Sequence, residues 1–198
     1  MSLPTTGPGR IEDLLPSFEP ENDLEERVAR DPQLLEGLAW GEPRAGHPEG
    51  SVAAHVEDLL EMLEEWDEPA ERRTKLRFIA LVHDAFKGDV MERLPKIGRN
   101  HHADRARRFA EDYTDDQALL SVIQHHDRPY ALWRKMKRKG SLDERGFMKM
   151  IEDIPDVALF VRFVELDGST EGKTPGPIAW LRVELRNRGH ELPQPPHV

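Results

Sequence analysis

The stretch FIALVHDAFKGD, residues 78–89, decides how this chain is interpreted. Its apolar start belongs in a protein core, yet the run ends in His83 and Asp84, with Lys87 three residues later. Burying a polar group without a partner costs several kcal/mol. A helix that brings an imidazole and a carboxylate into the interior therefore needs something that compensates both groups, and a metal ion is one candidate.

Helical periodicity, interrupted by proline and glycine, extends over most of the chain on both sides of this stretch. No alternating strand pattern and no internal repeat is visible, so the fold class predicted is all-α. We expect a single-domain helical bundle over residues 21–190, with a flexible arm at 1–20 and a flexible tail at 191–198, because both ends are rich in proline. The predicted helical segments are 21–29, 32–40, 51–66, 70–87, 101–113, 116–126, 129–138, 143–152, 155–167 and 177–188.

The helical phase places a His or an Asp on the apolar face of five of these segments. These inward side chains are His55, His83, His102, His126 and Asp167. Asp84 adjoins one of them, whereas His101 falls on the polar side beside Arg105 and Arg108. So many isolated buried titratable groups would unfold a protein whose net stability is about 5–15 kcal/mol. We therefore interpret them as converging on one cationic centre.

Composition limits the function further. The 198 residues suffice for one domain with a sizeable core, and the formal net charge of −10 argues against extended nucleic-acid binding and against anionic membranes. No apolar run reaches the roughly 18 residues of a transmembrane helix, and no secretory signal is visible, so we expect a cytoplasmic protein. Because the chain has no cysteine, any metal must bind nitrogen and oxygen ligands.

The ordered set of His55, His83-Asp84 and Asp167, with Lys87 completing H-D-x-x-K, resembles the HD-domain superfamily of metal-dependent phosphohydrolases. The resemblance covers roughly residues 47–170. It implies the same all-α fold, a divalent metal centre and hydrolysis of phosphate esters.

Other parts of the sequence refine this resemblance. The stretch GHPEGSVAAHVEDLL, residues 46–60, is similar to the opening of the HD domain in some tRNA nucleotidyltransferases. The usual H-D-I-G-K motif has Ala85 and Phe86 in place of Ile and Gly. No Gly-Tyr-Pro follows His125-His126-Asp127, which argues against cyclic-di-GMP as the substrate.

The resemblance also implies roles for individual residues. Asp84 would act in catalysis with Lys87, and would bridge the two ions if a second metal binds. Lys87, Arg99 and His125 would bind the substrate. One or two divalent ions (Mn, Fe, Ni, Co, Zn or Mg) would be held, with His102 and His126 serving a second ion or donating to a substrate phosphate. The expected metal ligands are His55, His83, Asp84, His102, His126 and Asp167.

The predicted activity is that of a phosphomonoesterase or phosphodiesterase, with metal-activated water attacking a small nucleotide-like phosphate ester, including 2′,3′-cyclic phosphates. Two alternatives stay open: an HD-fold di-iron oxygenase, and a non-catalytic module that binds a nucleotide. The basic run WRKMKRK, residues 133–139, is interpreted as a solvated helix face, with steering of a polyanionic substrate as the alternative. Residues 170–177 are interpreted as a linker, and His47 as a loop residue.

Overall fold

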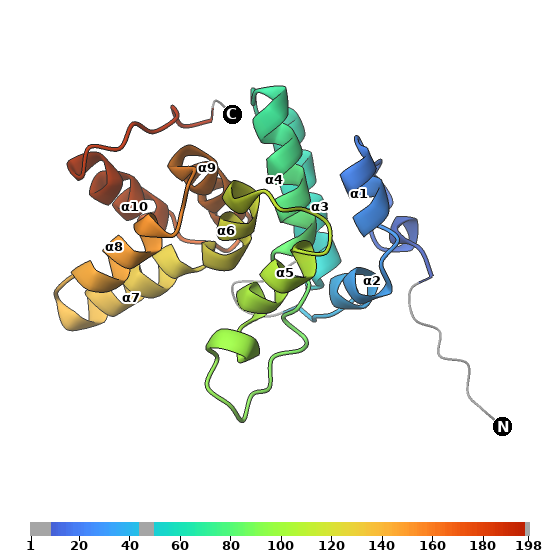
Figure 1. The fold of residues 1–198 in the computed structure, drawn as a ribbon, viewed down its shortest axis with the longest axis horizontal. Coiled ribbons are helices and arrows are strands. Elements are labelled where there is room, and N and C mark those ends of the chain that lie inside the picture. The colour runs from blue at the N-terminus through green and yellow to red at the C-terminus, as the bar shows by residue number, and fades with distance from the viewer. Residues whose placement is uncertain (1–8, 44–49, 197–198) are drawn as a thin grey trace.

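A computed structural model of the protein describes residues 9–43 and 50–196. These residues form ten α-helices and two short 3-10 helices and no strand, so the predicted all-α class is confirmed (Figure 1). The elements are η1 (Ile11–Asp13), α1 (Asp23–Val28), α2 (Pro32–Leu38), α3 (Val52–Glu65), α4 (Ala70–Val82), η2 (Gly98–Asn100), α5 (His102–Ala110), α6 (Gln117–His125), α7 (Arg128–Lys139), α8 (Glu144–Glu152), α9 (Val157–Gly168) and α10 (Gly176–Asn187).

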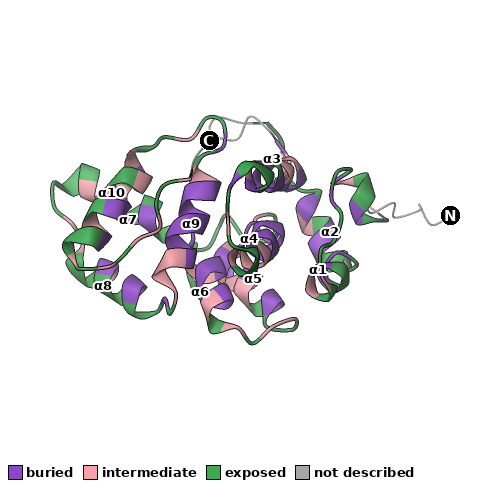
Figure 2. Cartoon of the chain, turned by 90° about the horizontal axis from the view of Figure 1, so that it is seen from above, coloured by how far each residue is buried: buried purple, intermediate pink, exposed green. Residues whose placement is uncertain are grey.

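Helix α4 lies at the centre of the bundle and packs against α3, α6 and α9. Helices α1 and α2 flank this centre on one side, and α7, α8 and α10 lie on the other (Figure 1). Every residue from 76 to 86 is buried, so the end of α4 is enclosed on all sides, as an apolar helix end should be. Figure 2 shows buried residues along α4 and α9, whereas much of the outer surface of α7, α8 and α10 is exposed.

Side-chain caps fix where the helices that carry candidate ligands begin. Ser51 accepts a hydrogen bond from the backbone N–H of Ala54 at 3.1 Å, and Asp156 accepts one from Leu159 at 2.8 Å. Each cap satisfies a backbone donor that the first helical turn leaves open. The caps therefore set the rotational position of every residue in α3 and α9.

The end of α4 differs from the prediction, which continued this helix to residue 87. The α-helix ends at Val82, and the chain continues in tight turns in which Ala85 N donates to Val82 O at 3.2 Å and Lys87 N to Asp84 O at 3.1 Å. Helix α2 packs closely on this turn at Gly37, where a Cβ atom would lie 1.8 Å from the carbonyl oxygen of Ala85. Glycine is thus required for α2 to support the turn that carries Asp84.

The described parts of both chain ends, predicted to be flexible, make contacts with the helices. Ile11, Leu15 and Phe18 are buried in the core, because their apolar side chains find a surface against the neighbouring helices. At the other end, the guanidinium of Arg182 donates to the carbonyl oxygen of Pro193. In the described residues, no helix is both long enough and apolar enough to cross a membrane.

Candidate metal centre

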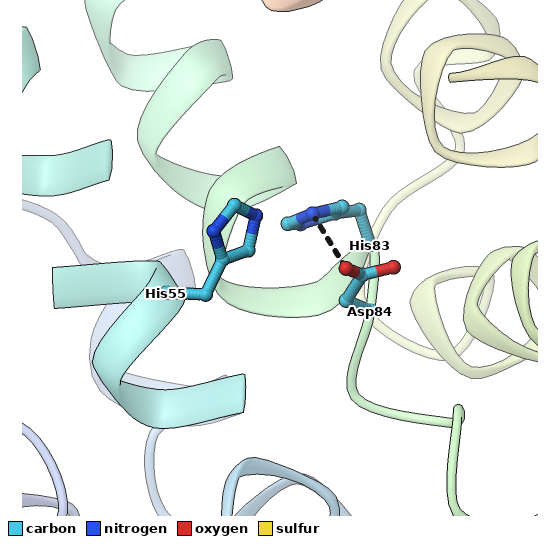
Figure 3. A group of neighbouring side chains, drawn as sticks. All are labelled: His55, His83 and Asp84. Carbon is cyan, nitrogen blue, oxygen red and sulfur yellow. Dashed lines mark ion pairs between the residues drawn. The ribbon is translucent and has the colours of Figure 1, made fainter. Parts of the chain in front are cut away.

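Four of the predicted ligands meet where α3, the end of α4 and the end of α9 come together. His55 Nε2 on α3 lies 3.0 Å from Asp167 Oδ1 on α9. His83 Nε2 lies 3.3 Å from Asp84 Oδ2 and 3.9 Å from Asp167 Oδ1. Figure 3 shows the imidazole of His55 facing that of His83, with ring centroids 5.5 Å apart. Residues distant in sequence therefore present nitrogen and oxygen atoms to one small volume.

The other two predicted ligands gather on the opposite oxygen of Asp84. His102 Nε2 on α5 and His126 Nε2 at the end of α6 lie 3.4 and 3.5 Å from Asp84 Oδ1, and 3.4 Å from each other. Two groups with metal-ligand spacing thus share Asp84, one on each carboxylate oxygen. We call the six side chains the His/Asp cluster: His55, His83, Asp84, His102, His126 and Asp167.

Backbone hydrogen bonds orient two of the imidazoles. His83 Nδ1 donates to Ala80 O at 3.0 Å, and His126 Nδ1 donates to Ile123 O at 2.8 Å. In both rings Nδ1 is engaged by a carbonyl of the preceding helical turn, so Nε2 is the nitrogen directed at the cluster. This is how a protein usually fixes the orientation of a metal-binding histidine.

His83 Nε2 and Asp84 Oδ1 are buried and make no hydrogen bond. Buried polar atoms are nearly always paired, so these two require an explanation. A divalent cation fits, because neutral imidazole nitrogens and carboxylate oxygens are the ligands that Mn, Fe, Co, Ni and Zn accept. The donor set and its burial are therefore compatible with a divalent metal.

Each carboxylate of the cluster has a lysine beside it. Burial alone would raise the pKa of Asp84, but the ammonium of Lys87, hydrogen-bonded to Oδ2, holds this pKa well below its ordinary value. Burial would likewise raise the pKa of Asp167, and Lys173, whose Nζ lies 3.5 Å from Oδ1, lowers it together with His55. Both carboxylates are consequently ionised and available as ligands at neutral pH.

The two histidines near Asp84 Oδ1 have opposite pKa shifts. Burial lowers the pKa of His102 to about 3. Burial also disfavours the charged form of His126, but the adjacent carboxylates of Asp84 and Asp127 outweigh this and raise its pKa to about 9. At neutral pH this pair therefore carries one proton more than two neutral imidazoles do, on His126, and a metal ion held by His126 would displace that proton.

Four residues of the cluster, Asp84, His102, His126 and Asp167, line a cavity of about 410 Å³. This volume is within the size range of sites for small organic ligands. Two charged residues of this cavity, Asp127 and Lys173, were not predicted as site residues from the sequence. Asp127 follows His126 directly, and its pKa falls to about 2 because His101 and His126 outweigh the effect of burial. Other residues that line this cavity include Lys87, Asp127, Tyr130, Val164, Lys173 and Ile178.

Comparison with known proteins agrees with this geometry. Residues 46–159, more than half of the chain, match the HD domain. The chain belongs to the HD-domain family. Membership implies the superfamily of metal-dependent phosphohydrolases, and HD domains are typically metal-dependent hydrolases. No curated protein and no solved structure matches the chain.

Two residues predicted to bind substrate lie away from the centre of this HD domain. Arg99 is exposed in η2 and does not line the cavity beside the cluster. His125 Nε2 faces Asp153 at 3.8 Å, on the α8 side of the molecule. Successive helical residues point about 100° apart, so the inward position of His126 turns His125 outward. The positions of Arg99 and His125 give no support to their substrate-binding roles, which stay predictions.

His101 differs from its predicted position for a related reason. It is the N-cap residue of α5 with extended backbone, so the helical phase that placed it beside Arg105 does not apply to it. Its ring stacks on that of His102 with centroids 4.7 Å apart, and its Nε2 lies 3.3 Å from Asp127 Oδ2. His101 and Asp127 therefore form the rim of the centre, and His102 lies between them and Asp84.

The remaining candidates are His47 and the basic run at residues 133–139. His47 lies outside the described residues. In the basic run on α7, Lys135 is hydrogen-bonded to Asp143, Lys137–Lys139 are exposed, and none of the run lines the cavity of this HD domain. The solvated-face interpretation agrees with these positions.

Proposed function

We propose that this HD-domain protein is a metal-dependent phosphohydrolase that acts on a nucleotide-like phosphate ester, as a phosphomonoesterase or phosphodiesterase. The observation that carries the proposal is the pair of ligand groups that share Asp84, which lines a cavity together with two lysines. The metal ligands alone would be compatible with several metal-dependent reactions, among them hydrolysis and oxygenation. Lysines beside them favour an anionic substrate such as a phosphate ester.

In this proposal His55, His83, Asp84 and Asp167 hold one divalent ion, and Asp84 with His102 and His126 holds a second. A bound cation of this kind lowers the pKa of water and polarises a phosphoryl oxygen. The carboxylate of Asp84, ionised at neutral pH, would join the two ligand groups, which makes it the residue on which the whole site depends.

Lys87 would act at the substrate itself. It is three-quarters buried beside Asp84 and lines the cavity, so its ammonium is within reach of a phosphoryl group held at the cluster. A fixed positive charge there stabilises the negative charge that grows on the phosphoryl oxygens in the transition state. No serine or cysteine nucleophile is needed for this reaction.

The test is a screen of nucleoside phosphomonoesters and phosphodiesters for phosphate-ester cleavage by protein supplied with Mn²⁺, Co²⁺, Ni²⁺, Fe²⁺, Zn²⁺ or Mg²⁺. We expect turnover that a chelator abolishes. Asp84→Asn should lower both metal content and turnover at least about 100-fold, since changes outside the ligand sphere of metal sites already cost 10–100-fold. Asp153→Asn, an exposed carboxylate outside the cluster, is the matched control and should retain both.

The screen also decides between this proposal and the two alternatives. Protein that is purified with two irons and consumes oxygen would favour an oxygenase. Protein that binds a nucleotide but cleaves no ester with any metal would favour a non-catalytic module. Either result would overturn the proposed hydrolysis.

A further inference from the structure

Lys173 has no counterpart among the residues that the sequence resemblance singled out. It lies in the connection between α9 and α10, and its Nζ is 3.5 Å from Asp167 Oδ1. Its side chain is 23% exposed, close to the 22% of Lys87, which pairs with the other carboxylate of the cluster. Both lysines line the same cavity. The centre therefore has one ammonium group beside each of its two carboxylates.

The connection is shaped so that Lys173 returns to the centre. Thr170 Oγ1 donates to Asp167 O at 3.2 Å, and Lys173 N donates to Thr170 O at 3.3 Å. Between them Gly172 has φ +79°, a left-handed conformation that reverses the chain and that glycine adopts without strain. The lysine is thus held beside Asp167 by a defined turn and is not a side chain extended into solvent.

Lys87 and Lys173 interact with different partners when the oxygens of Asp84 and Asp167 serve as metal ligands. Metal coordination then neutralises Asp84 and Asp167, and the ammonium groups of Lys87 and Lys173 become available to an anion in the cavity. Two ammonium groups that approach from different elements favour a ligand with several charged oxygens.

The charges indicate which phosphate ester fits best. Around the centre, Asp84, Asp127 and Asp167 are nearly balanced by the two lysines, so bound divalent ions leave a surplus of positive charge. A phosphomonoester carries about −1.5 to −2 charges at neutral pH, whereas a diester carries only one. We infer that Lys173 and Lys87 together form a receptor for the dianionic phosphate of a monoester, and that the site selects monoesters over diesters.

The inference rests on the proposed function and narrows it to one substrate class. The rest of the cavity suits the organic part of such a substrate. Val164 and Ile178 contribute apolar wall, and Tyr130, 48% exposed, adds an aromatic ring. An aromatic ring beside an apolar wall is a suitable surface for a planar group such as a base. A phosphate at the lysines and a planar group at Tyr130 describe a nucleoside monophosphate.

The experiment measures anion binding without turnover. Inorganic phosphate and dimethyl phosphate are titrated calorimetrically into Mn²⁺-loaded protein, and Mn²⁺ content is determined separately. We expect wild-type protein to bind phosphate more tightly than dimethyl phosphate. Lys173→Ala should weaken phosphate binding roughly tenfold or more, the usual effect of losing one hydrogen bond to a charged group. Its Mn²⁺ content should stay the same or rise, because a positive charge beside Asp167 is removed.

Two further variants make the result specific. Lys173→Arg should recover most of the phosphate affinity. Lys135→Ala breaks a similar lysine–carboxylate pair, with Asp143, outside the cavity and should leave phosphate binding unchanged. Unchanged phosphate affinity in Lys173→Ala, or equal affinity of wild-type protein for the two anions, would overturn the inference.

The outcomes separate the inference from the proposed function. Wild-type protein that binds Mn²⁺ and shows the expected Lys173 effect, yet cleaves no ester, would contradict the proposed hydrolysis and support the anion receptor. Wild-type protein that cleaves diesters faster than monoesters, with Lys173→Ala unaffected, would contradict the receptor and support hydrolysis.

Discussion

A histidine can serve this centre only if the correct ring nitrogen faces it. In His83 and His126 the choice is made locally, because Nδ1 of each ring donates to the carbonyl three residues earlier. Both residues sit at a helix C-cap, where the last carbonyls have no partner within the helix. The same hydrogen bond therefore completes the helix end and directs Nε2 toward Asp84.

His101 illustrates the opposite helix end. Its Nδ1 accepts a hydrogen bond from Ala103 N at 3.3 Å as the N-cap of α5, and its Nε2 faces Asp127. We predict that His101→Ala lowers the free energy of unfolding by about 1 kcal/mol, the usual cost of losing an N-cap. His101→Asn restores a capping group without the contact to Asp127, so it should recover this loss in urea denaturation.

The two variants separate capping from any role at the rim of the centre. If His101→Asn is as stable as wild type but has altered metal content, the contact with Asp127 matters to the site. Equal stability of the Ala and Asn variants would contradict the capping role.

At the scale of helices, periodicity located the elements well and their ends less well. The inward phase of His55 and His102 could be predicted because an α-helix fixes the direction of every side chain once its apolar face is known. The end of α4 could not be, because Ala85 and Phe86 are apolar and are buried in the turn as they would be in a helix. Periodicity does not distinguish the two.

Residues outside helices account for the missed part of the site. Asp127 precedes α7, and Lys173 lies in a turn, so no periodic pattern indicates the direction of either side chain. Lys173 comes to Asp167 only through the reversal at Gly172. The one available signal was proximity in sequence: each residue lies close to a predicted ligand.

Contacts between elements far apart in sequence were also beyond the sequence analysis. Tyr113, just after α5, donates its hydroxyl hydrogen to Asp31 Oδ2, and Asp31 is the N-cap residue of α2. Burial and this hydrogen bond raise the pKa of Tyr113 to about 12. The contact links α2, which supports the turn carrying Asp84, to the connection between α5 and α6.

This contact gives a prediction for alkaline pH. A pKa raised by folding means that the folded state holds the phenolic proton more tightly than the unfolded chain does. The contribution of Tyr113 to stability is therefore complete below pH of about 10, the ordinary tyrosine value, and is lost as pH rises through about 12. Tyrosinate absorbance should show a late step near pH 12 in wild-type protein, with circular dichroism recorded in parallel.

The chain has only two tyrosines, so the step can be assigned by substitution. Tyr113→Phe should remove the late step, whereas Tyr130→Phe should retain it. A late step that persists in Tyr113→Phe would show that the hydrogen bond to Asp31 does not control it.

For the whole molecule, the region matched to the HD domain is not the complete folded unit. Residues 9–43 precede the match at 46–159, yet they contribute fully buried side chains, among them Leu34 and Leu38. Gly37, also in this region, contacts the turn that carries Asp84. The N-terminal segment therefore belongs to the support of the metal centre and should not be removable without loss of the site.

One attachment of this segment is a buried ion pair between Glu25 of α1 and Arg77 of α4. Glu25 is fully buried, and its carboxylate accepts hydrogen bonds from Arg77 Nε at 3.1 Å and Nη2 at 3.0 Å. We predict that Arg77→Met lowers the free energy of unfolding by about 3–5 kcal/mol, because it leaves a buried carboxylate without its partner. The double variant Arg77→Met with Glu25→Leu should regain most of this loss in urea denaturation.

The control is Arg30→Met, which breaks the exposed pair with Glu26 and should lower the free energy of unfolding by no more than about 0.5 kcal/mol. If Arg77→Met costs as little as Arg30→Met, the ion pair does not hold the N-terminal segment in place.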